Sequence, residues 1–266
     1  MEKVLLITGN GRRHRYAANL IAKNLNLCGA VFETKASVTG NQATDPNREE
    51  KIIQKHFRQR DEAEIKHLGE LVTASTKITT LEVEHGASNS TPVFEWVQKQ
   101  NPDLLLLYGS SIIKPPLLDY YDGKIINMHL GLSPYYRGSG TNFWPLVEGL
   151  PECVGVTIHI ATSKVDAGSI ITQVRPQSIS TDGNAHDIGT KTIIAGLNKM
   201  CEIVPRFMSK QIELFSQDLS EGKLFKRKDF TADAVLKLWE NLENGMIEKY
   251  LNHKKNRDSK FPIIEQ

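Results

Sequence analysis

The chain has 266 residues, a hydrophobic fraction of 39% and a formal net charge of +2, enough for one large domain or one domain with a small addition. Charge so small and so evenly scattered argues against nucleic-acid or membrane partners. The three cysteines have no CxxC or Cys–His ligand spacing, which predicts reduced thiols in a cytoplasmic protein and no metal site.

The first predicted element is a buried strand at residues 3–8, which ends in the glycine turn Gly9–Asn10–Gly11. Its apolar run is too short for a signal peptide or a membrane span. Apolar residues at helical spacing then predict a helix that begins at Arg12. Strand, glycine turn and helix are typical of the opening of a doubly wound sheet. The turn lacks the full GxGxxG fingerprint, so it indicates no dinucleotide.

Two arginines, Arg12 and Arg13, stand at the start of this helix, where positive charge is unfavourable against the helix dipole. Backbone amides at a helix N-terminus favour anions, and arginine can hold a phosphate through two parallel hydrogen bonds. We therefore expect a large anion of the substrate, such as a nucleotide diphosphate, to be bound by Gly9, Asn10, Gly11, Arg12 and Arg13. The alternative is that both arginines are solvated surface residues.

The next part of the chain mixes charged and apolar segments. The patterns predict a strand at 30–33, a polar loop at 35–47, an amphipathic helix or two at 48–73, a strand at 78–83 and a short helix at 93–100. In the charged helix, Arg58 and Arg60 are interpreted as part of a solvated face. The continuous apolar run at 104–108 predicts a central parallel strand that is covered on both sides.

The most informative stretch is KIINMHLGLSPYYRG, from Lys124 to Gly138. A strand here would place Asn127 and His129 on one face, because side chains two residues apart in a strand project together. Glycines and a proline then end the strand. An amide and an imidazole are thus delivered together at the carboxyl end of a strand, where open α/β sheets bind their ligands. Taken alone, each residue is more simply a turn former or a structural side chain.

The second half of the chain returns to alternating elements. The patterns predict a helix at 139–149, a half-buried strand at 154–160, a strand at 169–174, a long helix from 184 to about 210, a helix around 234–242 and a tail without clear periodicity. On the half-buried strand, His159 falls on the polar side and is interpreted as structural. Asp166, in the loop before the next strand, is by itself a common turn former.

Several separated motifs of this chain occur in an order that resembles the folate-dependent formyltransferase family: Asn127–Met128–His129, Leu132–Ser133–Pro134, Tyr136–Arg137–Gly138, Gly155–Val156–Thr157 and Val165–Asp166–Ala167–Gly168. That family includes glycinamide ribonucleotide transformylase, methionyl-tRNA formyltransferase and N-formyltransferases of nucleotide-linked amino sugars. The resemblance covers about residues 1–215. The chain departs from the family pattern in the LGLSP sequence after His129 and in Ala167, where threonine is common.

The resemblance implies an α/β fold with a doubly wound, mostly parallel sheet flanked by helices. It implies a catalytic domain at 1–215, and leaves 216–266 as a short C-terminal helical extension. It assigns catalysis to Asn127, His129 and Asp166. The pterin ring of 10-formyltetrahydrofolate, the implied co-substrate, would lie against Ser110, Ser111, Ile112, Ile113, Ala161 and Val165. Ser111 stands where one relative has arginine, so that contact would be lost or replaced.

The acceptor is less well defined by the residues than the reaction. The HLGLSPYYRGSGTNFWPLV motif looks most like sugar N-formyltransferases of surface-polysaccharide pathways, and Arg12 with Arg13 fits a nucleotide-diphosphate sugar. Glycinamide ribonucleotide is the alternative acceptor, because Gly9–Asn10–Gly11 resembles that transformylase. Residues 216–266 are too short for the tRNA-contacting domain of methionyl-tRNA formyltransferases. Hydrolysis of formylfolate and non-catalytic binding of folate or nucleotide remain further alternatives, and a homodimer is the candidate oligomer.

Overall fold

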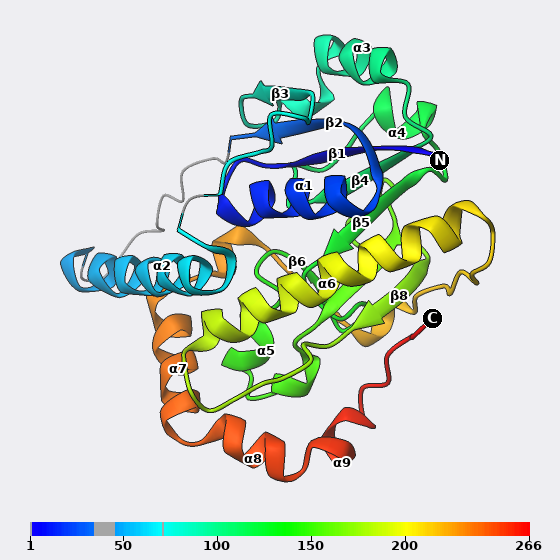
Figure 1. Ribbon diagram of the computed structural model, residues 1–266. Coiled ribbons are helices and arrows are strands. Elements are labelled where there is room, and N and C mark those ends of the chain that lie inside the picture. Colours follow the sequence, from blue (N-terminus) through cyan, green and yellow to red (C-terminus); the bar gives the residue numbers. More distant parts are fainter. Residues whose placement is uncertain (1, 35–45, 71) are drawn as a thin grey trace.

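The computed structural model describes residues 2–34, 46–70 and 72–266. Within them, seven strands form one sheet in the order β3-β2-β1-β4-β5-β7-β8 (Figure 1). The strands are β1 Lys3–Gly9, β2 Asn26–Glu33, β3 Thr80–Val83, β4 Leu104–Tyr108, β5 Ile125–His129, β7 Val156–Ile160 and β8 Ile170–Val174. The first five of these in the sheet are parallel, and β7 and β8 are antiparallel to their neighbours. The predicted doubly wound, mostly parallel sheet is confirmed.

Helices cover both faces of this sheet (Figure 1). Helices α1 (Arg12–Asn24) and α6 (Ala185–Met208) lie on one face, where their apolar sides share a core with alternate residues of β1, β4 and β5. Helices α3 (Thr91–Gln100) and α4 (Leu117–Tyr120) pack on the other face. Strand β4 is fully buried, as its continuous apolar run predicts for a strand covered on both sides.

Helix α2 (Pro46–Leu68) contacts α1, the N-terminal part of α6 and α7 rather than lying flat on the sheet. His67 and Lys66 at its carboxyl end both reach the Asp187 carboxylate, at 2.7 and 2.9 Å. The amphipathic helix predicted at 48–73 is thus one helix. Of the polar loop predicted at 35–47, residues 35–45 lie outside the described residues and Pro46–Asn47 already begin α2.

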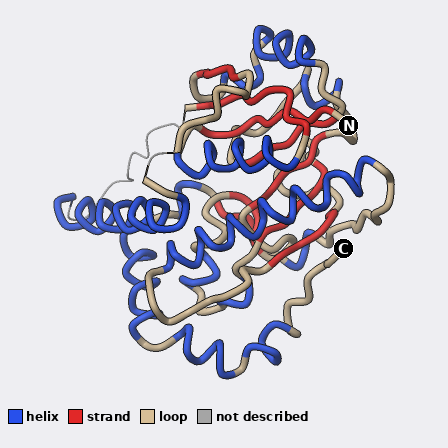
Figure 2. The backbone as a smooth tube through the Cα atoms, viewed as in Figure 1, coloured by secondary structure: helices blue, strands red, loops and turns tan. Residues whose placement is uncertain are grey.

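The C-terminal part of the chain wraps around the lower end of the sheet (Figures 1 and 2). A small parallel pair joins β6 (Tyr136–Gly138) to β9 (Lys223–Phe225), and helices α7 (Ala232–Glu243), α8 (Met246–Asn252) and α9 (Lys254–Asp258) follow. The tail predicted to lack periodicity, residues 253–266, therefore contains one short helix, α9, and α8 precedes it. Short 3-10 turns occur at Ala87–Asn89, Pro151–Cys153, Leu219–Glu221 and Arg227–Asp229.

Two sequence predictions in this half are wrong in detail. The helix predicted at 139–149 is only α5, Trp144–Val147, because Gly140 has a positive φ of 73° and Pro145, lacking an N–H, fits only the first turn. Strand β7 is not half-buried: both of its faces are covered. Its polar side lies under the loops of the site described below, so the alternation of residue types did not mark solvent.

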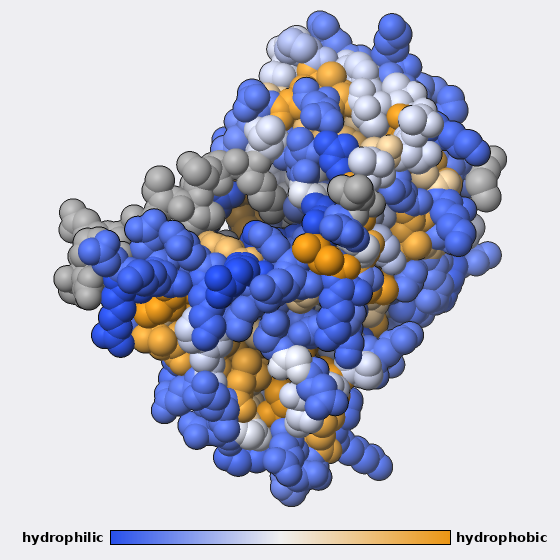
Figure 3. Space-filling view, turned by 60° about the vertical axis from the view of Figure 1, so that its left-hand side comes forward, coloured by the Kyte–Doolittle hydropathy of each residue, from blue (hydrophilic) through white to orange (hydrophobic). Residues whose placement is uncertain are grey.

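Among helices built from the described residues, none combines the length and the apolar character needed to cross a bilayer. Figure 3, turned so that α2 comes forward, shows a mainly hydrophilic face with apolar side chains exposed in separate groups. All three cysteines are free thiols, as the sequence predicts.

Candidate active site

Strand β5 sets the two polar side chains of the NMH motif beside each other. Asn127 pairs in register with Leu107 of β4 and with His159 of β7. Met128 points into the core beneath α6, so Asn127 and His129 project to the opposite side, as the period of a strand requires. Both lie near the carboxyl end of the parallel strands, and the predicted shared face is confirmed.

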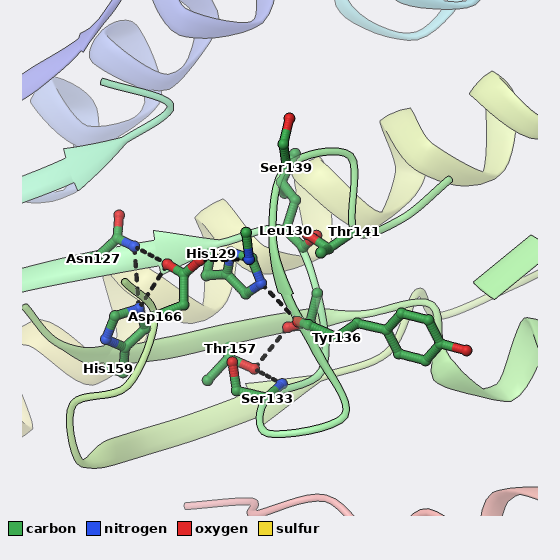
Figure 4. A network of polar contacts seen from close by, with 12 residues as sticks. Asn127, His129, Leu130, Ser133, Tyr136, Ser139, Thr141, Thr157, His159 and Asp166 are labelled. Carbon is green, nitrogen blue, oxygen red and sulfur yellow. Dashed lines mark hydrogen bonds and ion pairs between the residues drawn. The ribbon is translucent and has the colours of Figure 1, made fainter. Parts of the chain in front are cut away.

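Asp166 lies in the loop between β7 and β8 and reaches back over β5 (Figure 4). Its Oδ2 lies 3.3 Å from Nδ1 of His129 and accepts a hydrogen bond of 2.9 Å from the backbone N–H of Gly138. Its Oδ1 accepts from the amide nitrogen of Asn127 at 3.2 Å. The amide, the imidazole and the carboxylate, which the sequence separates by up to 39 residues, thus converge on one point.

A fourth side chain belongs to this cluster, and the sequence interpretation missed it. His159 is 2% exposed, and its Nε2 lies 3.5 Å from Oδ1 of Asp166. Its Nδ1 lies 2.8 Å from the carbonyl oxygen of Ile160, which fixes the proton on that nitrogen. Nε2 therefore accepts from the Asn127 amide at 3.1 Å. The register of β5 with β7, invisible in the local alternation, is the signal that places His159 here.

The amide of Asn127 is oriented by these two contacts. Its nitrogen faces both Asp166 and His159, and its oxygen points away from them (Figure 4). The opposite orientation would set the amide oxygen against a carboxylate, so the network determines this assignment. A substrate oxygen that takes a hydrogen bond from Asn127 must displace one of these two acceptors.

Burial and charge act against each other in the central pair. Burial raises the pKa of Asp166, but the neighbouring His129 and His159 and the Gly138 amide lower it more, and the carboxyl stays well below its usual range. Burial lowers the pKa of His129, and the Asp166 carboxylate opposes that shift. Asp166 is therefore ionised across the physiological pH range, and its charge favours any positive charge that develops beside it.

The loop after β5 holds the imidazole from the other side. Nε2 of His129 donates to the backbone oxygen of Tyr136 at 2.9 Å. A Cβ on Gly131 would lie 2.6 Å from that same Nε2, so only glycine leaves room for the ring. Thr157 ties the loop down, since its hydroxyl donates to the Gly131 oxygen at 2.7 Å and accepts from the N–H of Ser133 at 2.9 Å. The imidazole is thus fixed at both nitrogens.

The loops predicted to contact a pterin flank this cluster. Ile113 and Ala161 pack in the same apolar cluster, next to Ile125 of β5. Ile112 is 54% exposed and Val165 is 36% exposed, unusual for aliphatic side chains beside a buried polar site. They expose apolar area beside the cluster, and their contact with a pterin ring stays a prediction. The predicted residues Ser110 and Ser111 are half-buried at the carboxyl end of β4.

A buried carboxylate anchors this loop. Glu33, at the end of β2 and 2% exposed, accepts from the N–H of Gly86 at 2.6 Å, the hydroxyl of Ser88 at 2.6 Å and the N–H of Ser111 at 3.2 Å, and also from the Ser111 hydroxyl. Asn89 bonds the Ile112 oxygen at 2.9 Å and the Lys114 N–H at 2.7 Å. Ser111 is therefore a structural contact of Glu33 in addition to any role toward a ligand.

The residues predicted to hold an anion lie two strands from Asn127, beyond the end of β1. Arg12 donates to the backbone oxygens of Gly69, at 2.6 Å, and of Glu70. Arg13 pairs with Glu64 of α2 at 3.2 Å. Both guanidinium groups thus have intramolecular partners, and a bound anion would have to exchange with them or add to them. Arg60 contacts Phe57 and Asp61 and is one-third exposed, whereas Arg58 is mainly solvated, as predicted.

Among the residues that the structure describes, no group of three or more histidine, cysteine or acidic side chains could hold a metal ion. The cluster itself offers a carboxylate, an imidazole and an amide within hydrogen-bonding distance of one another, with apolar loops beside them.

Comparisons with known proteins show likeness both in sequence and in fold. The sequence pattern of the formyl transferase family matches residues 4–202. Over 128 residues the chain is 34% identical to the methionyl-tRNA formyltransferase of Geobacillus sp. (strain WCH70), an alignment that covers 47% of this chain and 39% of that protein. The chain thus spans about two fifths of the length of the curated relatives it matches.

Two solved structures illustrate the likeness in fold. The N-formyltransferase from Helicobacter canadensis, in complex with folinic acid and dTDP-3-aminofucose, has a TM-score of 0.54 and 18% identity, and the match covers 85% of this chain and 71% of that one. The phosphoribosylglycinamide formyltransferase from Streptococcus pneumoniae TIGR4 has a TM-score of 0.54 and 20% identity, covering 78% of this chain and 99% of that one.

Proposed function

The chain belongs to the formyl transferase family, and we propose that it transfers the formyl group of 10-formyltetrahydrofolate to the amino group of a nucleotide-linked amino sugar. The observation that carries this proposal is the convergence of Asn127, His129 and Asp166 at the end of β5. A protein that only binds folate or a nucleotide has no physical need for all three groups around one point.

The reaction requires these side chains to stabilise an oxyanion and to move a proton. The amine nitrogen bonds to the formyl carbon, the carbonyl becomes an oxyanion, and the bond from that carbon to N10 then breaks. Donors preorganised around the oxyanion are worth about 3–4 kcal/mol each in such reactions. Asn127 and His129 are the donors, and the developing negative charge itself raises the affinity of His129 for a proton.

A proton must also leave the attacking amine and reach N10 of the departing folate. Asp166 supplies a fixed negative charge that stabilises the positive amine nitrogen in the intermediate, and it passes the proton on directly or through a water. Its low pKa makes lasting protonation of the carboxylate unfavourable, which suits a relay that returns the proton at once. The Gly138 N–H and the Asn127 amide, which both donate to it, keep the carboxylate in place.

For the acceptor, a sugar carrying a nucleotide diphosphate is supported by the arginines at the start of α1. Arg12 and Arg13 stand on the same edge of the sheet as the catalytic cluster, and α2 brings Arg60 toward Arg13. The diphosphate would replace part of the contact between Arg13 and Glu64. A structural relative of similar fold is described in complex with dTDP-3-aminofucose, which makes this chemistry compatible with the architecture.

Glycinamide ribonucleotide is the second candidate acceptor. The Gly9–Asn10–Gly11 turn precedes a helix N-terminus that suits a phosphate, and a phosphoribosylglycinamide formyltransferase has a similar fold. A single monophosphate makes less use of two arginines than a diphosphate does. We therefore rank it below the nucleotide sugars.

The test is an acceptor screen. Purified protein is incubated with 10-formyltetrahydrofolate and, separately, with a panel of nucleotide-linked amino sugars, glycinamide ribonucleotide and methionyl-tRNA, and the acceptor is examined by mass spectrometry for the added mass of one CO. We expect a product with an amino sugar together with stoichiometric tetrahydrofolate. A product with one of the other acceptors would reassign the substrate. Tetrahydrofolate formed without any amine would identify a hydrolase, and no turnover at all would favour a binding protein.

A further inference from the structure

The segment from Phe215 to Phe225 lies against the loop that carries Asp166, although it follows the residues that match the family pattern. Ile170, at the start of β8, exchanges two backbone hydrogen bonds with Phe215, of 2.7 and 3.0 Å. Because this pairing is antiparallel, Gln217 comes to lie opposite Gly168. The chain beyond the family match is thus led directly to the turn that follows Asp166.

Gln217 bonds the backbone of that turn with its side chain. Its Nε2 donates to the carbonyl oxygen of Gly168 at 2.6 Å and to that of Asp166 at 3.1 Å. The orientation of the amide is determined, since an oxygen in place of the nitrogen would face two carbonyl oxygens. One amide group therefore fixes the spacing of the two carbonyls on either side of Ala167.

The turn needs such a support. Asp166 has a φ of +48°, a left-handed conformation that residues with a Cβ adopt unfavourably and that persists only where the surroundings impose it. On the inner side, a Cβ on Gly168 would clash with the carbonyl oxygen of Ile160, so β7 blocks movement in that direction. Gln217 bonds the turn from its outer side. The backbone of Asp166 is thus held between β7 and Gln217.

The same segment also holds the side chain of Asp166, through β9. Strand β9 pairs with β6, and Phe225 accepts a hydrogen bond of 2.9 Å from the N–H of Ser139. This fixes Gly138, whose own N–H donates to Oδ2 of Asp166 at 2.9 Å. A Cβ on Gly222 would clash with the Pro134 oxygen, which shows how closely the segment lies on this loop.

We propose that Gln217 is a positioning residue for the reaction: its amide holds the turn at residues 166–168 so that the Asp166 carboxylate stays beside His129 and Asn127. This inference rests on the proposed function of Asp166 in formyl transfer. Gln217 touches neither substrate nor the reacting atoms in this scheme. It acts through the backbone of Asp166, and it makes the C-terminal segment a necessary part of the active site.

The first test is kinetic. Gln217→Glu keeps the size of the side chain but sets an acceptor against two carbonyl oxygens, and Gln217→Ala removes the bonds without adding charge. We expect both to lower kcat about 10- to 100-fold, as displacements of about 1 Å do, while KM for folate and acceptor changes less than about threefold. Gln211→Ala, an exposed glutamine six residues earlier, is the matched control and keeps wild-type kinetics.

The second test does not need turnover. The pKa of His129 is followed by NMR of histidine-labelled protein; the charged and titratable groups that act on this ring are Asp166, His159 and Arg137. Because the Asp166 carboxylate raises the pKa of His129, its displacement in Gln217→Ala lowers that pKa, in the same direction as Asp166→Asn. Thermal unfolding checks that each variant is folded. If Gln217→Glu does not fold, the comparison of Gln217→Ala with the wild type decides the test.

The outcomes separate this inference from the proposed function. Wild-type kcat and an unchanged His129 pKa in folded Gln217→Ala would overturn the positioning role. If the wild-type protein formylates no acceptor but the His129 pKa still responds to Gln217, the positioning role stands and the proposed reaction fails.

Discussion

At the scale of single residues, the site is a cluster in which each polar group limits its neighbours. Asn127 gives its amide hydrogens to Asp166 and His159, and His129 is engaged at both nitrogens. In the free protein, every hydrogen-bond donor of Asn127 and His129 therefore already has a partner within the protein. Substrate binding exchanges internal hydrogen bonds for new ones, which favours interactions that are completed only when the oxyanion forms.

Glu33 gives a prediction about the folate side of the site. Burial raises the pKa of this carboxyl, but hydrogen bonds from Ser111, Ser88 and the Gly86 amide lower it below its usual value, so it is an anion with several donors. In Glu33→Ala these donors lose their acceptor and the loop at 110–114 loosens. We expect KM for 10-formyltetrahydrofolate to rise about tenfold, the factor of one lost hydrogen bond to a charged group, with kcat nearly unchanged.

The control for this variant is Glu84→Ala, which removes an exposed carboxylate near the end of the neighbouring strand β3. Glu84→Ala should leave both KM for 10-formyltetrahydrofolate and kcat unchanged. A Glu33→Ala protein with wild-type affinity for folate would show that the loop at 110–114 does not bind the co-substrate.

Residue-level chemistry was predictable from the sequence where it depended on short spacing. Asn127 and His129 share a face because a strand has a period of two, and Asp166 was identified by the order of motifs. His159 was not, because the polar side of β7 is covered by the Asp166 loop instead of solvent. The role of Gln217 could not be predicted either, since no short-range sequence pattern links it to residues 166–168.

At the scale of elements, α2 docks on α6 through two histidines, the buried His56 and the half-buried His186. The ring centroids of His56 and His186 are 4.4 Å apart, and the His56 ring also contacts Phe143 and Phe230. Burial lowers the pKa of His56 to about 4, helped by Arg60, and burial with His56 and Arg60 lowers that of His186 to about 3. Both rings are neutral in the folded protein at pH 5–7.

This arrangement predicts a loss of stability in acid. The unfolded chain binds protons on these histidines below about pH 6.5 and the folded chain does not, so stability falls as the pH falls from 6.5 toward 4. Between pH 7 and pH 5 each histidine should contribute a loss of about 2 kcal/mol. We expect His56→Phe to lose about that much less than the wild type, measured by urea unfolding at the two pH values. Equal losses in both proteins would contradict the conclusion that both rings are neutral in the folded protein.

Two glycines of α6 make a matched pair for the contact between this helix and the sheet. A Cβ on Gly196 would lie 2.7 Å from Cγ2 of Val156, whereas a Cβ on Gly189 meets no described atom within 4 Å. Gly196→Ala should therefore cost about 1–3 kcal/mol of unfolding free energy through overpacking. Gly189→Ala should add about 0.5–1 kcal/mol, because alanine favours the helix.

Chemical denaturation measures both glycine variants. A Gly196→Ala protein as stable as Gly189→Ala would mean that α6 stands further from β7 than described. Elements of this kind were predictable in outline from apolar periodicity. Their docking was not: the short α5 depends on Gly140 and Pro145, and the position of α2 against α6 and α7 depends on contacts far apart in the sequence.

At the scale of the whole molecule, the C-terminal part is joined to the rest by more than a linker. Helices α7 and α8 share an apolar cluster with α5 and α6, and β9 extends the loop of the catalytic motif. The division into a catalytic domain at 1–215 and an extension at 216–266 stays a prediction. Gln217, which lies just beyond this predicted boundary, bonds the backbone of the Asp166 loop, and β9 pairs with β6, whose Gly138 N–H donates to Asp166.

The proposed function depends most on Asn127, His129 and Asp166 acting together in formyl transfer. The most direct measurement is the rate of tetrahydrofolate formation, with the acceptor found in the screen, for Asn127→Ala, His129→Ala and Asp166→Ala and for the double variant of His129 and Asp166. We predict that each single variant, folded as judged by circular dichroism, loses at least about 100-fold in turnover, about 2.7 kcal/mol, and that the double loses little more, because the groups act as a unit. Near-wild-type turnover in any folded single variant would contradict this joint action.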